Sequence, residues 1–350
     1  MYRQFLTITL ALIVTVSAFA DEDQQPTQQL DQQSNQQQEQ QLDQQSKEQQ
    51  EQDRPRETLE FKLPPANSQV IGKDISIRTN SADTLADIAE RYAIGYRELK
   101  IANPRVDPWL PGDRTRVLLS QRFILPDAPR KGIVLNTAEM RLYYYPKADP
   151  KKVITFPVSV GRGTWQTPVT TTHVMAHIPN PAWYPPASVR AEYKKEGRKL
   201  AGVVPPGPDN PLGQYAMSLG ISGYLIHGTS HPFAIGMQVT HGCIRLHPKD
   251  IKQLFHEVPN KTEVTIVYQP LKAGWKNGVL YLEAHPRLDA DTDKITIDQQ
   301  MKSVVDDATA SSPKFWVNWN RARQIAEDPD GIPHAIGRRI APVADSISQR

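Results

Sequence analysis

Two short stretches direct the interpretation of this chain: residues 224–229 read YLIHGT and residues 240–246 read THGCIRL. The second stretch contains Cys243, the only cysteine among 350 residues. A thiolate nucleophile needs a nearby base to hold it ionised, and a histidine at a strand end, such as His227, can supply that base across a loop. Gly242 lets the backbone approach an incoming carbonyl closely, so nearby amides can bind an oxyanion. The pattern predicts a nucleophile, a base and an oxyanion hole.

The sequence around these stretches is typical of β structure. From residue 131 onward, runs of β-branched and aromatic residues alternate with loops rich in proline and glycine. The runs lie at residues 133–135, 140–145, 153–160, 169–178, 223–227 and 262–268. Many short strands joined by such loops predict a sandwich or barrel with few helices. We expect a hairpin turn at residues 136–139 and a helix at residues 250–258.

The two stretches resemble a known signature. His-Gly-Thr followed by Thr-His-Gly-Cys-Ile-Arg-Leu is similar to the active-site motif of the L,D-transpeptidases of bacterial cell walls, also called the YkuD domain. The resemblance covers residues 131–269. It implies a mainly β fold, with a YkuD-type β-sandwich that carries one or two helices. It also implies a cysteine transpeptidase with no metal and no organic cofactor.

The resemblance further implies roles for individual residues. Cys243 would attack the carbonyl of a diaminopimelate, the third residue of a peptidoglycan stem peptide, expel the terminal D-Ala and hold a thioester. His227 would act as general base and then as general acid, oriented by the backbone carbonyl of Gly228. The residues expected to shape the oxyanion hole and the site are Thr240, His241, Gly242 and Arg245, and those expected to line a substrate groove are Trp183, Tyr184 and Tyr215. Arg245 would either order the site or contact a substrate carboxylate.

Several alternatives stay open at this point. The acyl acceptor is either the terminal lysine of an outer-membrane lipoprotein, which the order of modules favours, or a second diaminopimelate, which would cross-link the wall. A catalytically inactive structural protein that binds peptidoglycan is the alternative from another class. A zinc hydrolase is disfavoured because the histidines near Cys243 lack a standard ligand spacing and a paired glutamate.

The chain divides into segments of different composition. We expect a signal peptide at residues 1–20, a Gln-rich disordered linker at residues 21–63, a small module at residues 70–127, the catalytic domain at residues 131–269 and a partly helical extension at residues 270–350. The first segment combines Arg3, an apolar run and a closing Ala-Phe-Ala, which is typical of an export signal. We therefore expect a periplasmic protein with no stable membrane insertion after cleavage. The linker carries too little apolar surface to fold.

The small module has the pattern strand, helix, helix, strand. The strands are expected at residues 75–78 and 122–126, and the helices at residues 83–92, with Asp83 as N-cap, and 96–102. With Asp-Thr-Leu, Asn-Pro and Leu-Pro-Gly at matching points, this βααβ module resembles LysM, a small glycan-binding module. In the C-terminal extension we expect a strand at residues 279–283 and helices at residues 298–308 and 314–326.

The charge distribution suggests the kind of partner. The total is +3, but acidic residues are concentrated in the linker, so the remainder is basic. A basic exported protein suits an anionic partner, such as a cell-wall polymer with its stem peptides and glycan. We expect no nucleic-acid partner.

Overall fold

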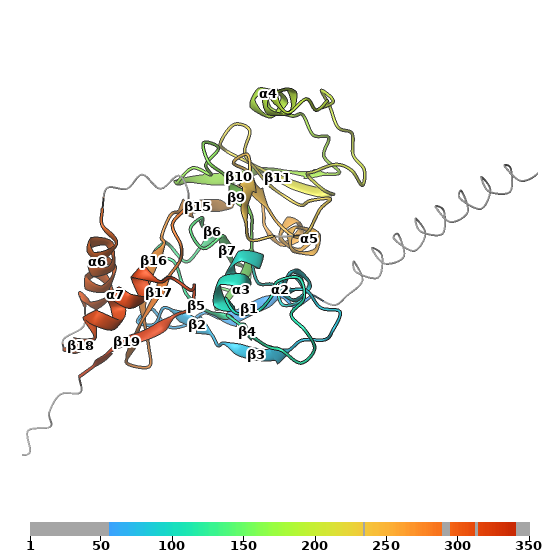
Figure 1. The fold of residues 1–350 in the computed structure, drawn as a ribbon. Helices are drawn as coiled ribbons and strands as arrows, with labels where there is room; N and C mark the ends of the chain where they lie inside the picture. The colour runs from blue at the N-terminus through green and yellow to red at the C-terminus, as the bar shows by residue number, and fades with distance from the viewer. Residues whose placement is uncertain (1–55, 234, 289–294, 312–313, 341–350) are drawn as a thin grey trace, which may run out of the picture. The chain divides into compact units, whose positions relative to one another are not determined.

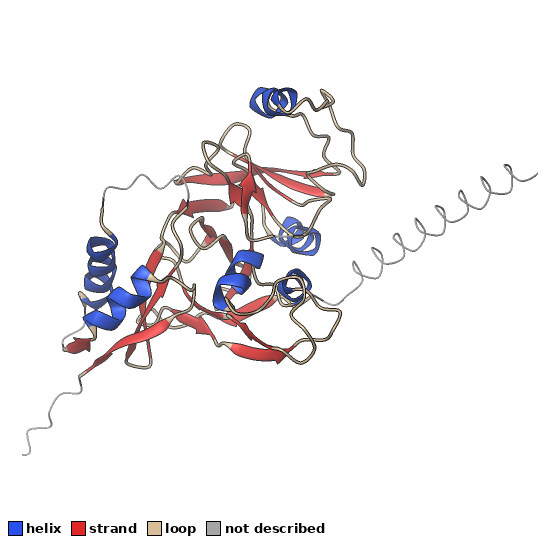
Figure 2. Cartoon of the chain, in the orientation of Figure 1, coloured by secondary structure: helices blue, strands red, loops and turns tan. Residues whose placement is uncertain are grey.

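The computed structural model describes residues 56–233, 235–288, 295–311 and 314–340. The predicted signal peptide and most of the predicted linker lie outside these residues. Strands predominate over helices, so the expected mainly β class is confirmed (Figures 1 and 2). Among the helices of the described ranges, none is long and apolar enough to cross a membrane.

A nine-stranded sheet forms the centre of the fold, in the order β1-β8-β7-β6-β15-β10-β11-β12-β14. Its strands are β1 (Leu59–Lys62), β6 (Gly132–Asn136), β7 (Arg141–Tyr145), β8 (Lys152–Pro157), β10 (Thr170–Pro179), β11 (Tyr215–Leu219), β12 (Leu225–His227), β14 (Ile244–Arg245) and β15 (Glu263–Val267). The predicted hairpin is confirmed, because β6 and β7 pair antiparallel. β1 falls within the predicted linker, so the end of that segment is ordered: its residues pair with β8, and Leu59 is buried.

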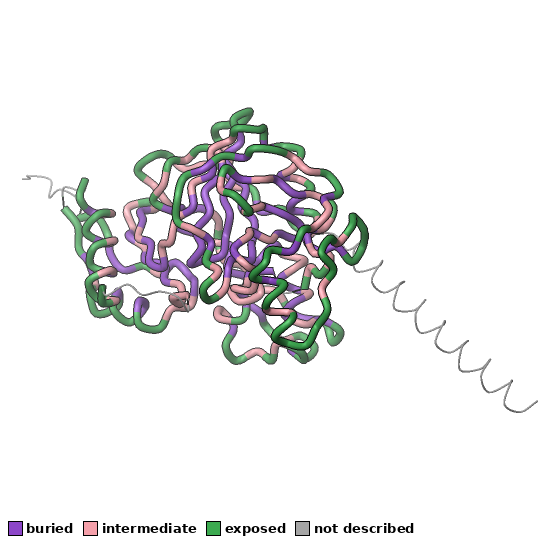
Figure 3. Tube along the Cα trace, turned by 90° about the horizontal axis from the view of Figure 1, so that it is seen from above, coloured by how far each residue is buried: buried purple, intermediate pink, exposed green. Residues whose placement is uncertain are grey.

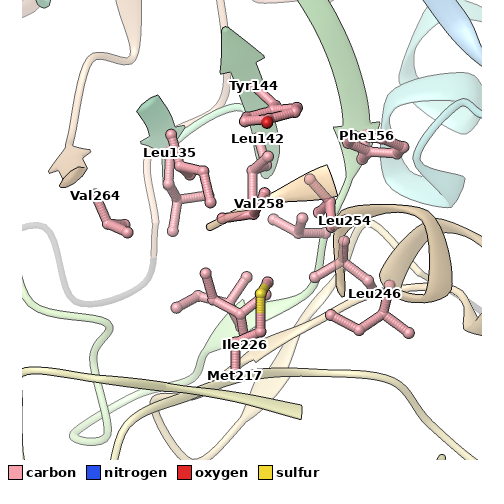
Figure 4. Packing of buried hydrophobic residues seen from close by; sticks show 14 of the residues in the cluster. Leu135, Leu142, Tyr144, Phe156, Met217, Ile226, Leu246, Leu254, Val258 and Val264 are labelled. Carbon is pink, nitrogen blue, oxygen red and sulfur yellow. The ribbon is translucent and has the colours of Figure 1, made fainter. Parts of the chain in front are cut away.

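β10 lets this sheet curl over a core. Its first residues pair with β15, and after an irregularity between Val174 and Ala176 its second half pairs with β11. Such irregularities bend a strand and increase its twist. Apolar side chains of both halves therefore meet in one cluster, where Leu135 and Leu142 lie opposite Met217 and Ile226 (Figure 4). The helix predicted at residues 250–258 is α5 (Pro248–Glu257), and it contributes Leu254 to the same core. Buried residues are concentrated in the interior of the trace, and exposed residues lie mainly on its periphery (Figure 3).

The small N-terminal module has the expected βααβ order, with two corrections. β3 (Ile75–Arg78), α2 (Leu85–Arg91) and α3 (Tyr96–Ala102) are followed by β4 (Arg116–Leu119). The closing strand is β4, because its buried Val117 and Leu119 face the helices, whereas β5 (Arg122–Ile124) pairs with β2 (Val70–Gly72). Thr84, and not Asp83, caps α2: its hydroxyl accepts from the amide of Asp87 in a capping box.

The C-terminal extension forms its own sheet, in the order β16-β17-β19-β18. Its elements are β16 (Leu271–Lys276), β17 (Val279–Ala284), α6 (Ile297–Thr309), β18 (Phe315–Val317), α7 (Trp319–Glu327) and β19 (His334–Arg339). The helix predicted at residues 298–308 is confirmed as α6. The helix predicted at residues 314–326 is wrong in its first turn, because residues 315–317 pair with β19 and the helix begins only after Asn318, whose side chain caps it.

A buried ionic cluster connects three parts of the chain. Lys272 of β16 lies between Glu139, in the β6–β7 turn, and Glu283 of β17. The other carboxylate oxygen of Glu283 accepts a hydrogen bond of 2.6 Å from the amide of Ile124, in β5. Buried charges are stable only when they are paired and hydrogen-bonded. This cluster therefore forms only when all three parts of the chain are in their native positions.

Candidate active site

The expected nucleophile and base lie on neighbouring strands. His227 is the last residue of β12, and Cys243 directly precedes β14. The two strands pair in parallel, with Ile226 opposite Ile244 and His227 opposite Arg245. Parallel pairing after a loop thus brings together residues that are separated along the chain. Side chains alternate along a strand, so Arg245 is expected on the same side as Cys243.

The loop before Cys243 has a constrained backbone. It starts from β13 (Gln238–Thr240), which pairs in parallel with β9 (Val160–Gly161). Gly242 has φ +103°, and an added Cβ would lie 2.8 Å from a ring carbon of Tyr224. The hydroxyl of Thr167 donates to the carbonyl of Gly242 at 2.8 Å, and that of Thr240 donates to the carbonyl of Cys243 at 2.6 Å. The carbonyl groups of Gly242 and Cys243 are thereby fixed.

His227 is buried, with 4% of its surface exposed, and its ring orientation is set by the main chain. Its Nδ1 lies 2.6 Å from the carbonyl oxygen of Gly228. A carbonyl only accepts, so this contact requires the proton on Nδ1, and the neutral ring then has its lone pair on Nε2. Burial, and then the positive charge of Arg245, lower the pKa of His227 to about 3. The imidazole is therefore neutral near pH 7 and can accept a proton.

The thiol of Cys243 is also neutral at rest. Burial raises its pKa above the ordinary value, although the charge of Arg245 acts in the opposite direction. Its Sγ lies 3.6 Å from the carbonyl oxygen of Gly223, to which the thiol can donate. The sequence pattern predicts that His227 holds the Cys243 thiol in its ionised form. The structure indicates a neutral pair, because burial disfavours the charged form of each group.

Arg245 is the charged neighbour of both groups. Burial lowers its own pKa, and its Nε is a buried donor for which the described residues offer no acceptor. An unsatisfied buried donor is costly, so this atom favours an acceptor group brought by a ligand.

His241, two residues before Cys243, has partners that sequence reasoning missed. Its Nε2 lies 2.6 Å from Oε2 of Glu192, in helix α4 (Ala187–Lys195). The rings of Trp165 and His241 are in edge-to-face contact, with 4.7 Å between their centroids. Glu192 also forms an ion pair with Arg162, whose guanidinium lies 5.4 Å from the centre of the Trp165 ring. Glu192 lies 49 residues from His241, and no motif marks it.

The predicted groove residues belong to two different parts of the fold. Trp183 and Tyr184 belong to the long connection between β10 and β11, where Trp183 pairs with Val204 and Tyr184 is 69% exposed. The ring of Tyr215 packs against Phe255 of α5 at 4.8 Å. A role of these three residues in a groove stays a prediction.

One group of side chains has metal-ligand chemistry, and it shares no residue with the site around Cys243. Glu139, Glu283 and His285 bring ligand atoms within 4.8 Å of one another. The ammonium of Lys272, 2.6 Å and 2.9 Å from the two carboxylates, takes the position that a cation would need. The group is therefore better described as an ion-pair cluster.

The chain is similar in sequence to a known family of proteins. Residues 130–266 match the family described as the L,D-transpeptidase catalytic domain, YkuD. "Probable L,D-transpeptidase YcfS" of Escherichia coli is 40% identical over 73% of this chain and 83% of its own length. "Probable L,D-transpeptidase ErfK/SrfK" of Salmonella typhimurium is 38% identical over 79% and 90%, and "Probable L,D-transpeptidase YbiS" of E. coli is 42% identical over 64% and 74%. The solved catalytic domain of the E. faecium L,D-transpeptidase is 20% identical, with a TM-score of 0.31, over 41% of this chain and all of that domain.

Proposed function

Because the chain belongs to the L,D-transpeptidase family, we propose that it transfers the acyl group of a peptidoglycan stem peptide through a thioester on Cys243. The observation that carries this proposal is the state of His227. Its Nδ1 proton is committed to the carbonyl of Gly228, so its Nε2 is available as a base on the strand beside the cysteine.

In the first half-reaction, Sγ of Cys243 attacks the carbonyl carbon of the third stem residue, and the thiol proton passes to Nε2 of His227. The amides near Gly242 would bind the oxyanion, since the backbone there is already fixed. When the intermediate collapses, the carbon–nitrogen bond breaks and the D-Ala amine takes the proton from His227. A thioester remains on Cys243.

In the second half-reaction, an amine attacks the thioester, and His227 accepts one of its protons. The carbon–sulfur bond breaks, and the proton returns to the leaving thiolate. A protonated His227 beside Arg245 is unfavourable in this buried site, as its lowered pKa indicates. The imidazolium would therefore pass its proton on quickly, which favours both collapse steps.

For the acceptor, we propose the terminal lysine of an outer-membrane lipoprotein, with a second diaminopimelate as the alternative. The lysine is supported by the predicted order of signal peptide, LysM-like module, catalytic domain and C-terminal extension. This order also supports export to the periplasm. The buried Arg245 Nε would contact a substrate carboxylate, since it lacks an acceptor among the described residues.

The test is mass spectrometry of the purified protein incubated with a tetrapeptide muropeptide. The wild type should release D-Ala and gain the mass of the tripeptide acyl group, whereas Cys243→Ala should do neither while keeping its circular dichroism spectrum. Adding a lysine-terminated peptide and a second muropeptide identifies the acceptor from the linked product. Absence of D-Ala release by the wild type would favour an inactive wall-binding protein.

A further inference from the structure

The connection between β10 and β11, residues 180–214, is a long excursion that we call the α4 segment. Figure 1 shows α4 carried on extended loops away from β10 and β11. The segment is organised internally: Trp183 pairs with Val204, and the side-chain amide of Asn210 donates to the carbonyls of Pro181 and Pro205. Within the helix itself, Val189 is the residue classed as buried. The segment therefore holds its own shape with little packing of α4.

One carboxylate links this segment to the catalytic loop. Glu192 contacts His241 with one oxygen and Arg162 with the other. The other side-chain hydrogen bonds and ion pairs found for residues 181–209, within the described ranges, stay inside the segment. Glu192 is thus the residue through which side-chain polar contacts attach the α4 segment to the residues around Cys243.

The attachment is close to the chemistry and is easily reversed. His241 lies two residues from Cys243, a backbone distance of at most about 8 Å. The hydrogen bond from His241, more than any other contact, lowers the pKa of Glu192, so the carboxylate is charged near pH 7. The side chains of Glu192 and His241 are 20% and 26% exposed, so water can replace either partner. Charge-assisted hydrogen bonds of this kind orient groups but yield to competition.

We propose that Glu192 is a positioning residue that holds the α4 segment against His241 and so protects the thioester on Cys243 from water. This inference rests on the proposed function. A thioester has two fates: attack by an amine forms the amide product, and attack by water forms a free carboxylate, with the thiol released in each case. A segment held on the loop would exclude bulk water while an acceptor peptide binds.

The experiment compares Glu192→Ala and Glu192→Gln with Glu196→Gln in the full chain. Glu196 is a matched control, because it follows the same helix and, among the described residues, its side chain pairs with Arg198 inside the segment. Each protein is incubated with tetrapeptide muropeptide and an amine acceptor, and the ratio of hydrolysed tripeptide to amide product is measured together with D-Ala release. Both Glu192 variants should raise this ratio roughly three- to tenfold, as expected for loss of one exposed charge-assisted contact. D-Ala release should stay within about twofold of the wild type.

The outcomes are distinguishable. A ratio in the Glu192 variants equal to that of Glu196→Gln overturns the inference and leaves the proposed function intact. A strongly reduced D-Ala release in the Glu192 variants, with an unchanged ratio in the remaining product, assigns Glu192 a structural role and also overturns the inference. A wild type that releases no D-Ala refutes the proposed function, and the inference falls with it.

Discussion

Replacing Lys272 with methionine removes the cation from the buried ionic cluster. Its Nζ lies 2.6 Å from Oε2 of Glu139, 2.9 Å from Oε1 of Glu283 and 2.6 Å from the carbonyl oxygen of Ile124. The side chains of Lys272, Glu139 and Glu283 are 3%, 2% and 0% exposed, so water cannot replace the ammonium. Methionine has a similar length, so the change removes charge and hydrogen bonds with little change in volume.

The expected loss of unfolding free energy at pH 7 is about 3–5 kcal/mol, the usual cost of removing one partner of a buried ion pair. The loss should shrink in acid. Burial raises the pKa of Glu283, but Lys272 and His285 together outweigh burial and hold this pKa at about 2, below the ordinary 4.5. The stability that depends on this shift is present above pH 4.5 and is lost as the pH falls toward 2. Wild type and Lys272→Met should therefore converge over that range.

Urea unfolding followed by tryptophan fluorescence measures this difference. Lys152→Met is the control, because its pair with Glu60 is 32% and 40% exposed, and such surface pairs contribute at most about 1 kcal/mol. A loss in Lys272→Met of less than about 1 kcal/mol beyond the control would refute the reasoning. A difference that grows as the pH falls would refute the assignment of Glu283 as the titrating partner.

Two further predictions concern the site. Burial raises the pKa of Cys243, and His227 is neutral, so few thiolates form near pH 7. The rate of alkylation by iodoacetamide should therefore keep rising above pH 8.5, where the rate for an ordinary thiol levels off. A plateau of this rate near neutral pH would indicate a thiolate–imidazolium pair instead. Gly242→Ala should slow acylation of Cys243 by at least about tenfold, because its φ of +103° and the Tyr224 ring leave no room for a Cβ. Gly223→Ala is the control, having φ +81° but no atom within 4 Å of the added Cβ. Equal acylation rates in the two variants would contradict this account.

The sequence by itself determined the features that depend on neighbouring residues. The hairpin of β6 and β7 follows from runs of β-branched and aromatic residues on both sides of a polar turn, and α2 follows from apolar residues at helical spacing. The residues around Cys243 could be proposed as a site from sequence, because a cysteine can act as a nucleophile, a histidine as a base, and a glycine lets the backbone approach a substrate closely. The N-cap of α2 was predicted one residue early, at Asp83. Aspartate and threonine are both N-cap residues, and only the geometry of Thr84 with Asp87 decides between them.

The tertiary structure alone decided the contacts between distant segments. Residues 116–119 close the small module because Val117 and Leu119 fit against its helices, a choice that local β propensity cannot make. Residues 315–317 form a strand because β19 offers them an edge. Glu192 reaches His241, and the neutral states of Cys243 and His227 arise, only when segments far apart in sequence enclose the site. Burial and long-range pairing set these properties, and neither is encoded in the spacing of a motif.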